Sequence, residues 1–205
     1  MPLEIELKLS FPETALAALH AHPLITAAPH EGEAEVLEST YYDTPAWALQ
    51  ARKIALRLRK TGGGTVQTAK CAAPSHAGLT HRPEWEQTWD GAFEFSGIDD
   101  PAVAAALEEA RDELQPVFST RFHRDTRRFE PRPGVRILAM IDTGSIEADA
   151  RREPICELEL ELVAGEPAEL TRLADELRKT LPLCPEDASK AERGYQLAAR
   201  AKRDD

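Results

Sequence analysis

Short segments in which apolar and charged residues alternate recur along this chain, and they constrain its fold more than any other feature. At the start, residues 3–9 read Leu-Glu-Ile-Glu-Leu-Lys-Leu. Successive side chains of a β-strand point to opposite faces, so this segment predicts a strand with one apolar and one charged face. The same alternation at residues 53–59 and 155–163 indicates a protein built around a sheet.

The order of the expected strands and helices defines the fold class. Strands are expected at residues 3–9, 35–43, 53–59, 66–70, 82–89, 117–126, 135–143 and 155–163. Helical patterns occupy residues 12–20, 47–51, 101–114, 167–181 and 188–202, and Asp100 is expected to cap the third of these. Hairpin-linked strands interrupted by a few helices predict an α+β fold with a mainly antiparallel sheet. Nothing in the middle of the chain reads as a linker, so residues 1–205 are expected to form a single domain.

The charged faces of these strands are sorted by sign. Like charges two residues apart occur at Glu4 and Glu6, Glu84 and Glu86, Glu157, Glu159 and Glu161, and Arg57 and Arg59. Any one of these pairs can be an ordinary solvated strand face, but several together fit a closed barrel whose charged faces line one interior. Clustered carboxylates suit Mg²⁺, Mn²⁺ or Ca²⁺ better than Zn²⁺, and guanidinium groups suit phosphate.

Composition and charge exclude several classes of function. The formal net charge of −11 argues against general nucleic-acid binding, although a local basic pocket assisted by metal ions can still hold a small anion. The first residues lack the basic and apolar parts of a signal peptide, and no run approaches the roughly 20 apolar residues of a membrane span. We therefore expect a cytoplasmic protein that binds neither nucleic acid nor membrane.

Segments from residue 4 to residue 195 resemble, in order, the motifs of the CYTH superfamily, which includes the triphosphate tunnel metalloenzymes. The similar segments are residues 4–8 (the ExExK signature), 41–45, 56–59, 68–70, 82–86, 157–161 and 189–195. One stretch departs from the family pattern: in residues 120–124 (Thr-Arg-Phe-His-Arg), Phe122 stands where a basic residue is usual. Arg124 is preferred over Arg121 as the residue that faces the tunnel.

The resemblance implies an eight-stranded antiparallel closed β-barrel, or tunnel, with peripheral helices. It also implies metal-dependent hydrolysis of inorganic triphosphate to diphosphate and phosphate. Related proteins act on thiamine triphosphate or cyclise ATP, so a thiamine triphosphatase or a class IV-type adenylate cyclase is an alternative. An alternative of another class is a non-catalytic module that binds polyphosphate or nucleotide. The expected partner is a triphosphate or nucleoside triphosphate, and the protein is expected to be a monomer or homodimer.

The resemblance also assigns roles to individual residues. The residues expected to grip the triphosphate are Lys8, Arg57, Arg59, Lys70, Arg124, Lys190 and Arg193. The residues expected to bind Mg²⁺ or Mn²⁺ are Glu4, Glu6, Glu159, Glu161 and Asp142, although a role of Asp142 in capping a turn explains that residue about as well. Glu84 and Glu86 are expected to activate water near a second metal. Tyr41, paired with Lys8, is expected to act on the leaving group.

Overall fold

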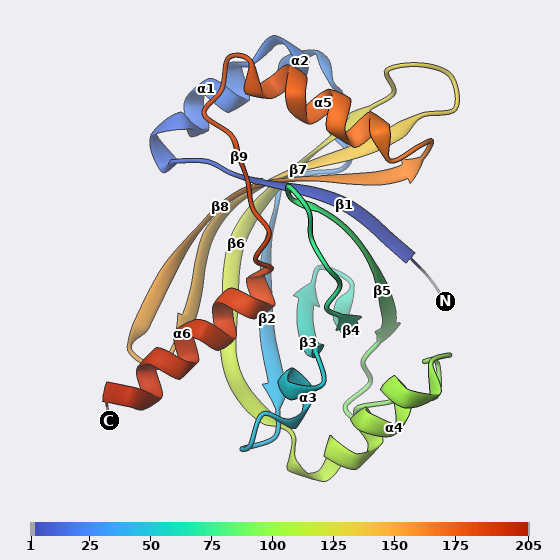
Figure 1. The fold of residues 1–205 in the computed structure, drawn as a ribbon, viewed down its shortest axis with the longest axis vertical. Coiled ribbons are helices and arrows are strands. Elements are labelled where there is room, and N and C mark those ends of the chain that lie inside the picture. Colours follow the sequence, from blue (N-terminus) through green and yellow to red (C-terminus); the bar gives the residue numbers. More distant parts are fainter. Residues whose placement is uncertain (1–2, 205) are drawn as a thin grey trace.

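The computed structural model describes residues 3–204, and its main feature is a closed antiparallel β-barrel (Figure 1). Its strands are β1 Leu3–Ser10, β2 Glu35–Asp43, β3 Ile54–Thr61, β4 Gly64–Cys71, β5 Leu79–Thr88, β6 Gln115–Phe129, β7 Arg136–Ala148 and β8 Arg151–Ala164. They pair in the order β5-β4-β3-β2-β6-β7-β8-β1, and antiparallel pairing of β1 with β5 closes the ring. The predicted α+β fold with an eight-stranded barrel is confirmed.

The largest apolar core lies outside the barrel wall. The helices α1 Leu16–Ala21, α2 Pro23–Ala27 and α5 Ala168–Arg178 cover one end of the sheet, at the top of Figure 1. Leu9 on β1, Ile137 on β7 and Leu158 on β8 are 0–1% exposed and pack with Leu170 and Leu177 of α5. The apolar face of each alternating strand therefore points outward to the helices, which turns the charged face inward.

A second outer core lies beneath α4 Pro101–Ala110 and the short 3₁₀ helix η2 Arg111–Glu113. Leu56 of β3 and Trp85 of β5 are buried there against Leu107 of α4. The carboxylate of Asp100 accepts hydrogen bonds from the backbone N–H groups of Ala102 and Val103, as predicted for an N-cap. The short helix α3 Ala48–Ala51 lies nearby and contacts both α4 and β3.

The third apolar cluster closes one part of the barrel interior. Phe118 and Phe122 lie on the same face of β6 as the cavity-lining Arg124, because strand residues separated by an even number point the same way. The helix α6 Lys190–Asp204 packs against this cluster through Tyr195. Gly194 permits this approach, since a Cβ atom there would lie 2.0 Å from the Phe118 ring. The barrel thus has an apolar region beside α6 and a charged region elsewhere.

Local differences from the predicted elements have clear causes. The helix expected at residues 12–20 consists of a 3₁₀ turn Glu13–Ala15 and α1, and the helix α2 that follows was not expected. His22 between α1 and α2 is extended (φ −62°, ψ 133°) because the following Pro23 disfavours a helical conformation. A two-residue strand, β9 Cys184–Pro185, adds to β1 and was not expected. Within residues 3–204, no helix has the length and apolar content needed to span a lipid bilayer.

Candidate functional site

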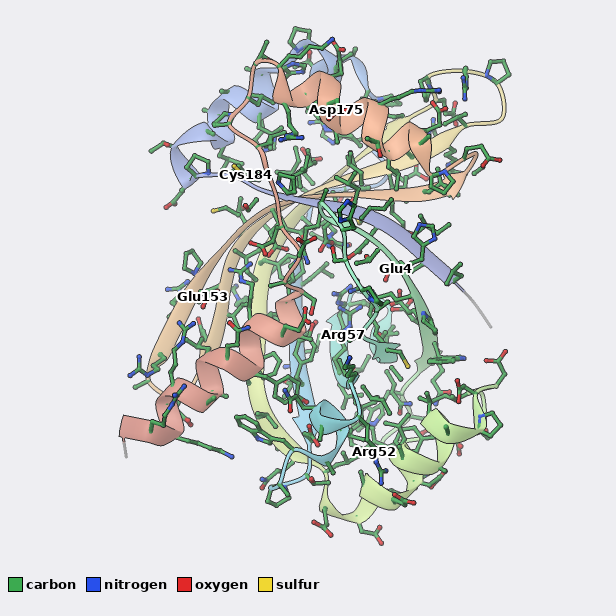
Figure 2. The ribbon with its side chains drawn as sticks, viewed as in Figure 1. Glu4, Arg52, Arg57, Glu153, Asp175 and Cys184 are labelled. Carbon is green, nitrogen blue, oxygen red and sulfur yellow. The ribbon has the colours of Figure 1, made fainter. Side chains whose placement is uncertain are left out.

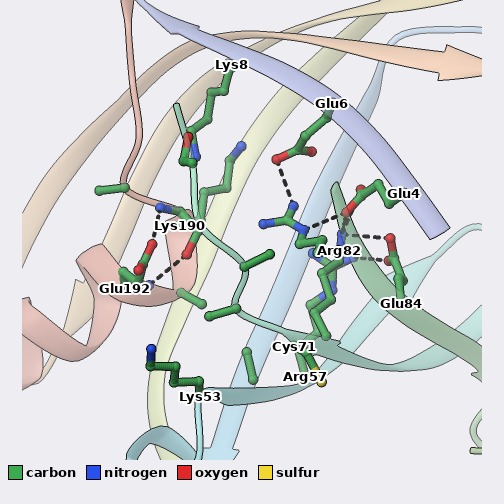
Figure 3. A pocket seen from close by; sticks show the side chains of 18 of the residues that line it. Glu4, Glu6, Lys8, Lys53, Arg57, Cys71, Arg82, Glu84, Lys190 and Glu192 are labelled. Carbon is green, nitrogen blue, oxygen red and sulfur yellow. Dashed lines mark hydrogen bonds and ion pairs between the residues drawn. The ribbon is translucent and has the colours of Figure 1, made fainter. Parts of the chain in front are cut away.

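A cavity of about 1030 Å³ occupies the charged part of the barrel interior (Figure 3). Of the residues proposed from the sequence, those that line it are Glu4, Glu6, Lys8, Tyr41, Arg57, Arg59, Lys70, Glu84, Glu86, Arg124, Glu159, Glu161 and Lys190. Figure 2 shows Arg57 within the barrel, whereas Arg52 lies beside α4, where it pairs with Glu109 at 2.7 Å. Asp142 and Arg193 do not line the cavity and lie behind its wall.

One charged group joins strands β1, β4 and β5, and we call it the β1–β5 group; it consists of Glu4, Glu6, Lys70, Arg82 and Glu84. Arg82 lies opposite Glu4 in the pairing of β1 with β5. Its Nε donates to Oε2 of Glu4 at 2.6 Å, and its Nη2 donates to Oε1 of Glu6 at 2.8 Å. Lys70 Nζ lies 2.9 Å from an oxygen of Glu4 and 2.9 Å from an oxygen of Glu84. Two cations thus bridge three carboxylates.

Arg82 is the member of this group that the sequence reasoning left without a role. It shares a strand face with Glu84 and Glu86, because the three residues follow one another at intervals of two. This spacing is the sequence feature that places Arg82 on the cavity-facing side of its strand. The pairing of β5 with β1 was not visible in the sequence, so the proximity of Arg82 to Glu4 and Glu6 could not be read from it.

The carboxylates of the β1–β5 group differ in the direction in which their pKa values are shifted. Burial would raise the pKa of Glu4, but Lys70 and Arg82 outweigh it and lower that pKa to about 2. Burial raises the pKa of Glu6 to about 7, and the nearby carboxylates of Glu159 and Glu4 act in the same direction despite Arg82. Burial also raises the pKa of Glu161, with Glu4 contributing further. Around Glu6 and Glu161 the protein therefore supplies too little positive charge.

A second charged group joins β6, β7, β8 and α6, and we call it the β6–β8 group; it consists of Arg124, Asp142, Glu157, Glu159 and Lys190. Lys190 Nζ donates to Asp142 at 2.9 Å, to Glu157 at 2.6 Å and to Glu159 at 2.8 Å. Arg124 binds both oxygens of Asp142 at 2.7 and 2.6 Å and reaches Glu159 at 2.7 Å. The three carboxylates have the mutual spacing of a metal site, but the ammonium of Lys190 already lies among them.

Asp142 and Arg193 support this second group from behind. Asp142 lies within β7 and is fully buried, so a turn-capping role does not apply. Arg193, one turn along α6 from Lys190, contacts Glu157 and also binds Glu153 at 2.7 Å. These contacts fix the start of α6 against the barrel. In the described chain, Asp142 is thus surrounded by the cations of Arg124 and Lys190.

Two cations of the cavity, the buried Lys8 and the half-buried Arg59, form no ion pair with an acid in the described part of the chain. Lys8 is 3% exposed, and its ammonium makes no hydrogen bond or ion pair with residues 3–204. The side chain of Arg59 makes one hydrogen bond there, from Nε to the hydroxyl of Ser39 at 3.1 Å. Burial, Arg57 and Arg124 lower the pKa of Arg59 to about 10. Holding cations in this state costs free energy, which a bound anion would recover.

Arg57 and Tyr41 lie next to these cations. Nη2 of Arg57 is 3.8 Å from Glu84 and 3.6 Å from Glu86, and its Nε is buried without a hydrogen-bond partner. Tyr41 is 4% exposed and stacks on Phe118 with ring centroids 4.4 Å apart. Burial would raise the pKa of Tyr41, but Arg57 and Arg59 lower it. The phenol thus interacts with Arg57, whereas Lys8 is not among the main causes of the shift of its pKa.

The stretch that departs from the family pattern divides cleanly between the two faces of β6. The side chain of Arg121 is 62% exposed and pairs with Glu38 outside the barrel, whereas that of Arg124 is 13% exposed and lies inside. Phe122 lies between these two residues in the sequence, and its side chain is buried and points inward. Its ring centre lies 5.9 Å from Arg59, 5.4 Å from Arg124 and 5.0 Å from Lys190. The ring therefore supports three cations through cation–π contacts.

The carboxylates of β1 and β8 fit a divalent cation. Glu6 lies opposite Glu161 and Lys8 opposite Glu159 in the pairing of β1 with β8, so the acids of the two strands face one cavity. The carboxylate of Glu161 makes no hydrogen bond or ion pair with the described residues. Oxygen donors of this kind, with raised pKa values at Glu6 and Glu161, match the preference of hard cations such as Mg²⁺ and Mn²⁺.

Solved structures with the same fold include three that cover nearly the whole chain. The Hippeastrum protein HpAC1, which has a dominant triphosphatase activity, superposes with a TM-score of 0.69 at 20% identity over 94% of this chain and 95% of its own. A Bacillus halodurans protein assigned as an adenylate cyclase gives a TM-score of 0.57 at 18% identity over 92% and 96%. PH1819 of Pyrococcus horikoshii OT3 gives 0.53 at 18% identity over 97% and 99%. At these identities the likeness shows the fold.

Sequence comparison identifies the family. The inorganic triphosphatase of Haemophilus influenzae (strain ATCC 51907 / DSM 11121 / KW20 / Rd) is 29% identical over 198 residues, which are 96% of this chain and 55% of the relative. The chain thus spans about half the length of the curated relative that it matches. The model of the CYTH domain matches residues 2–195. The chain belongs to the CYTH domain family.

Proposed function

We propose that this protein hydrolyses inorganic triphosphate to diphosphate and phosphate, with Mg²⁺ or Mn²⁺ as cofactor. The observation that carries the proposal is a pair of cations, the buried Lys8 and the half-buried Arg59, that form no ion pair with an acid of the described chain and face a cavity of about 1030 Å³. Such cations are stabilised by a polyanion. The 29% identity to an inorganic triphosphatase supports the same reaction. We also propose that residues 1–205 act as a single domain.

The cations would divide the work of binding. Lys8 and Arg59 would contact phosphate oxygens directly, because neither forms an ion pair with a carboxylate of the described chain, although both lie within the field of Glu159. Arg57 would join them, since its contacts with Glu84 and Glu86 are long. Lys70, Arg124 and Lys190 also line the cavity, but each already binds carboxylates and would share its remaining N–H groups with the substrate. We propose that Arg193 acts through Glu157 by holding Lys190 in place.

The acids would supply metal binding and proton transfer. Glu4, Glu6, Glu159 and Glu161 would hold the divalent ion, which neutralises charge on the phosphate oxygens when bound. Glu84 and Glu86 would orient water for in-line attack. Burial raises the pKa of Glu84, whereas Arg57 and Thr68 outweigh burial and lower the pKa of Glu86. Glu84 is therefore the better proton acceptor of the two.

Tyr41 would act near the leaving group. Its lowered pKa, which Arg57 and Arg59 cause against the effect of burial, makes the phenol a better proton donor than an ordinary tyrosine. The β1 and β8 carboxylates remain the proposed metal ligands. For Asp142, which binds Arg124 and Lys190, we propose the role of positioning those cations.

The lining of the cavity supports inorganic triphosphate over nucleotide or thiamine triphosphate as the substrate. Residues 72–74, which read Ala-Ala-Pro, and Lys53 are among the lining residues. Among described residues, the aromatic side chains that line the cavity are Tyr41 and Tyr195, and both are packed into the apolar cluster beside α6. Neither is free to stack on an adenine or a thiazolium ring, which base recognition commonly uses.

A phosphate-release assay tests the proposal. Triphosphate, ATP and thiamine triphosphate are each incubated with Mg²⁺, Mn²⁺ or EDTA. Metal-dependent release of phosphate that is fastest from triphosphate supports the proposal. Production of cyclic AMP from ATP would assign a cyclase, faster turnover of thiamine triphosphate would assign that activity, and saturable binding without turnover would assign a binding module.

A further inference from the structure

Arg82 occupies the position of a cation between two proposed metal ligands. Its guanidinium is 13% exposed and binds one oxygen of Glu4 and one of Glu6. These are the carboxylates of β1 that point into the cavity beside Glu159 and Glu161. Figure 3 shows Arg82 at the centre of this group, reaching from β5 toward β1. No role in binding or catalysis follows from the sequence motifs for this residue.

The geometry makes Arg82 and a divalent cation competitors. An ion held by Glu4 and Glu6 would compete for the two carboxylates that Arg82 now binds at 2.6 and 2.8 Å, and it would repel the guanidinium. Arg82 is not tied elsewhere, because its Nη1 makes no hydrogen bond with any residue in the range 3–204. It also lines the cavity, so a rotation of its long side chain brings it to a bound anion.

We propose that Arg82 is a positioning residue that holds Glu4 and Glu6 in place while the metal is absent and moves onto the triphosphate when the metal takes these carboxylates. This inference rests on the proposed function, because it names a further residue of the same site. The exchange couples the two ligands: metal binding releases an additional phosphate-binding group, and the bound phosphate in turn removes a competitor for the metal.

Lys70 does not offer the same exchange. Its ammonium is shared between Glu4 and Glu84, at 2.9 Å from each. Loss of Glu4 to a metal would leave Lys70 bound to Glu84. Arg82, by contrast, has both of its carboxylate partners in β1, and a metal bound by Glu4 and Glu6 would displace it from both.

The first test measures Mn²⁺ affinity, which needs no turnover. Mn²⁺ is titrated into wild type, Arg82→Gln and Arg82→Lys, and free Mn²⁺ is followed by electron paramagnetic resonance. We expect Arg82→Gln to bind Mn²⁺ about 10-fold more tightly, since a competing charge is removed, and Arg82→Lys to lie between. Arg121→Gln, the same change on the outer face, should match wild type. Unchanged or weaker Mn²⁺ binding by Arg82→Gln would overturn the proposal.

The second test measures the coupling. Binding of tripolyphosphate in EDTA, and of the hydrolysis-resistant imidotriphosphate with saturating Mn²⁺, is measured by calorimetry. For Arg82→Gln we expect less than a 2-fold change in EDTA but about a 10-fold loss with Mn²⁺. Equal losses under both conditions would show that Arg82 does not change partners. Because neither test uses turnover, a wild-type protein that binds Mn²⁺ but releases no phosphate would defeat the proposed function alone.

Arg82→Gln also removes a partner of two buried carboxylates, so its folding must be checked. Thermal melting with Mn²⁺ present establishes that the variant is folded under the titration conditions. If Arg82→Gln does not fold, Arg82→Lys carries the test, because a single ammonium cannot reproduce the two-pronged contact with Glu4 and Glu6. It should then bind Mn²⁺ more tightly than wild type, and Mn²⁺ binding equal to or weaker than wild type would contradict the exchange.

Discussion

The two charged groups inside the barrel are built from the same residue types but differ in how completely they neutralise themselves. In the β6–β8 group, one ammonium contacts three carboxylates and Arg124 contacts two of the same three. In the β1–β5 group and the adjoining part of β8, Glu161 has no partner among the described residues and the pKa of Glu6 is raised to about 7 by burial and by neighbouring carboxylates. The β6–β8 group is saturated, whereas the β1–β5 group together with Glu161, which we call the open group, has room for an added cation.

This difference indicates that one charged group mainly stabilises the fold, whereas the other mainly binds ligands in the same cavity. A saturated network of buried charges gains little from a ligand, and its members depend on one another for compensation. A group that is short of positive charge gains much from a metal ion, and cations without acidic partners gain much from an anion. We therefore expect substitutions in the β6–β8 group to affect stability most, and substitutions around the open group to affect ligand binding most.

Lys190→Met should have the largest effect on stability. The change leaves three buried carboxylates without the ammonium that they share, so the free energy of unfolding should fall by about 3–5 kcal/mol. Urea unfolding in EDTA measures this loss. Lys179→Met at the C-cap of α5 is the matched control, because the side chain of Lys179 is 66% exposed and its pairing with Glu176 contributes little.

Lys190→Met also tests whether the difference between the two charged groups comes from the ammonium of Lys190. The oxygens of Asp142, Glu157 and Glu159 lie within 4.8 Å of one another, so removal of Lys190 turns the saturated group into an open one. Added Mn²⁺ should then restore part of the lost stability. A fall of less than about 1 kcal/mol in EDTA would mean that the buried carboxylates do not depend on Lys190.

In contrast to Lys190→Met, Arg59→Ala should weaken anion binding and leave the stability of the fold nearly unchanged. Arg59 has no acidic partner among the described residues, so its removal should leave the free energy of unfolding unchanged or slightly raised. The affinity for tripolyphosphate should fall about 100-fold, because a half-buried cation that faces the anion is lost. Calorimetry in EDTA and urea unfolding together test both halves. A large loss of stability with unchanged affinity for tripolyphosphate would mean that Arg59 stabilises the fold and does not bind the anion.

Glu161→Gln should weaken metal binding while sparing the fold. We expect Mn²⁺ affinity to fall at least about 10-fold, since one ionised oxygen ligand is removed. Burial, with a smaller effect of Glu4, raises the pKa of Glu161, so in EDTA the folded protein holds this proton more tightly than the unfolded chain. Ionisation of Glu161 therefore destabilises the fold as the pH rises above the ordinary value of 4.5.

Urea unfolding of the metal-free protein at a series of pH values measures this contribution. In wild type, ionisation of Glu161 should lower the free energy of unfolding as the pH rises. Glu161→Gln should lack this part of the decline. Identical pH profiles for the two proteins, together with identical Mn²⁺ affinity, would remove Glu161 from the open group.

The strand faces were predictable from the sequence because the side-chain period of a strand is two. Once residues 3–9 are a strand, Glu4 and Glu6 must share a face, and the same holds for Arg57 and Arg59. The apolar faces then require a cover, which the predicted helices at residues 101–114 and 167–181 provide. The barrel and most of the cavity lining therefore follow from local patterns and from the family resemblance.

The partners of each charge were not predictable in this way. Arg82 and Glu4 are 78 residues apart in sequence, and Lys190 and Asp142 are 48 apart. Their contacts depend on strand register and on the placement of α6, which a single sequence does not encode in any local pattern. For the same reason, Asp142 could not be distinguished beforehand as a metal ligand, a turn cap or a partner of buried cations.

Arg121→Ala should have the smallest effect, and it tests the argument from strand faces most directly. Arg121 and Arg124 are three residues apart on β6, so they lie on opposite faces of the barrel wall. The pair that Arg121 forms with Glu38 is exposed, so its loss should change the free energy of unfolding by at most about 0.5 kcal/mol and leave Mn²⁺ and tripolyphosphate affinities unchanged. Arg124→Ala, made in parallel, should reduce both stability and anion binding, because it removes the cation that Asp142 and Glu159 share with Lys190. If the two alanine variants behave alike, the register of β6 is not the one described, and the separation into a saturated and an open group fails with it.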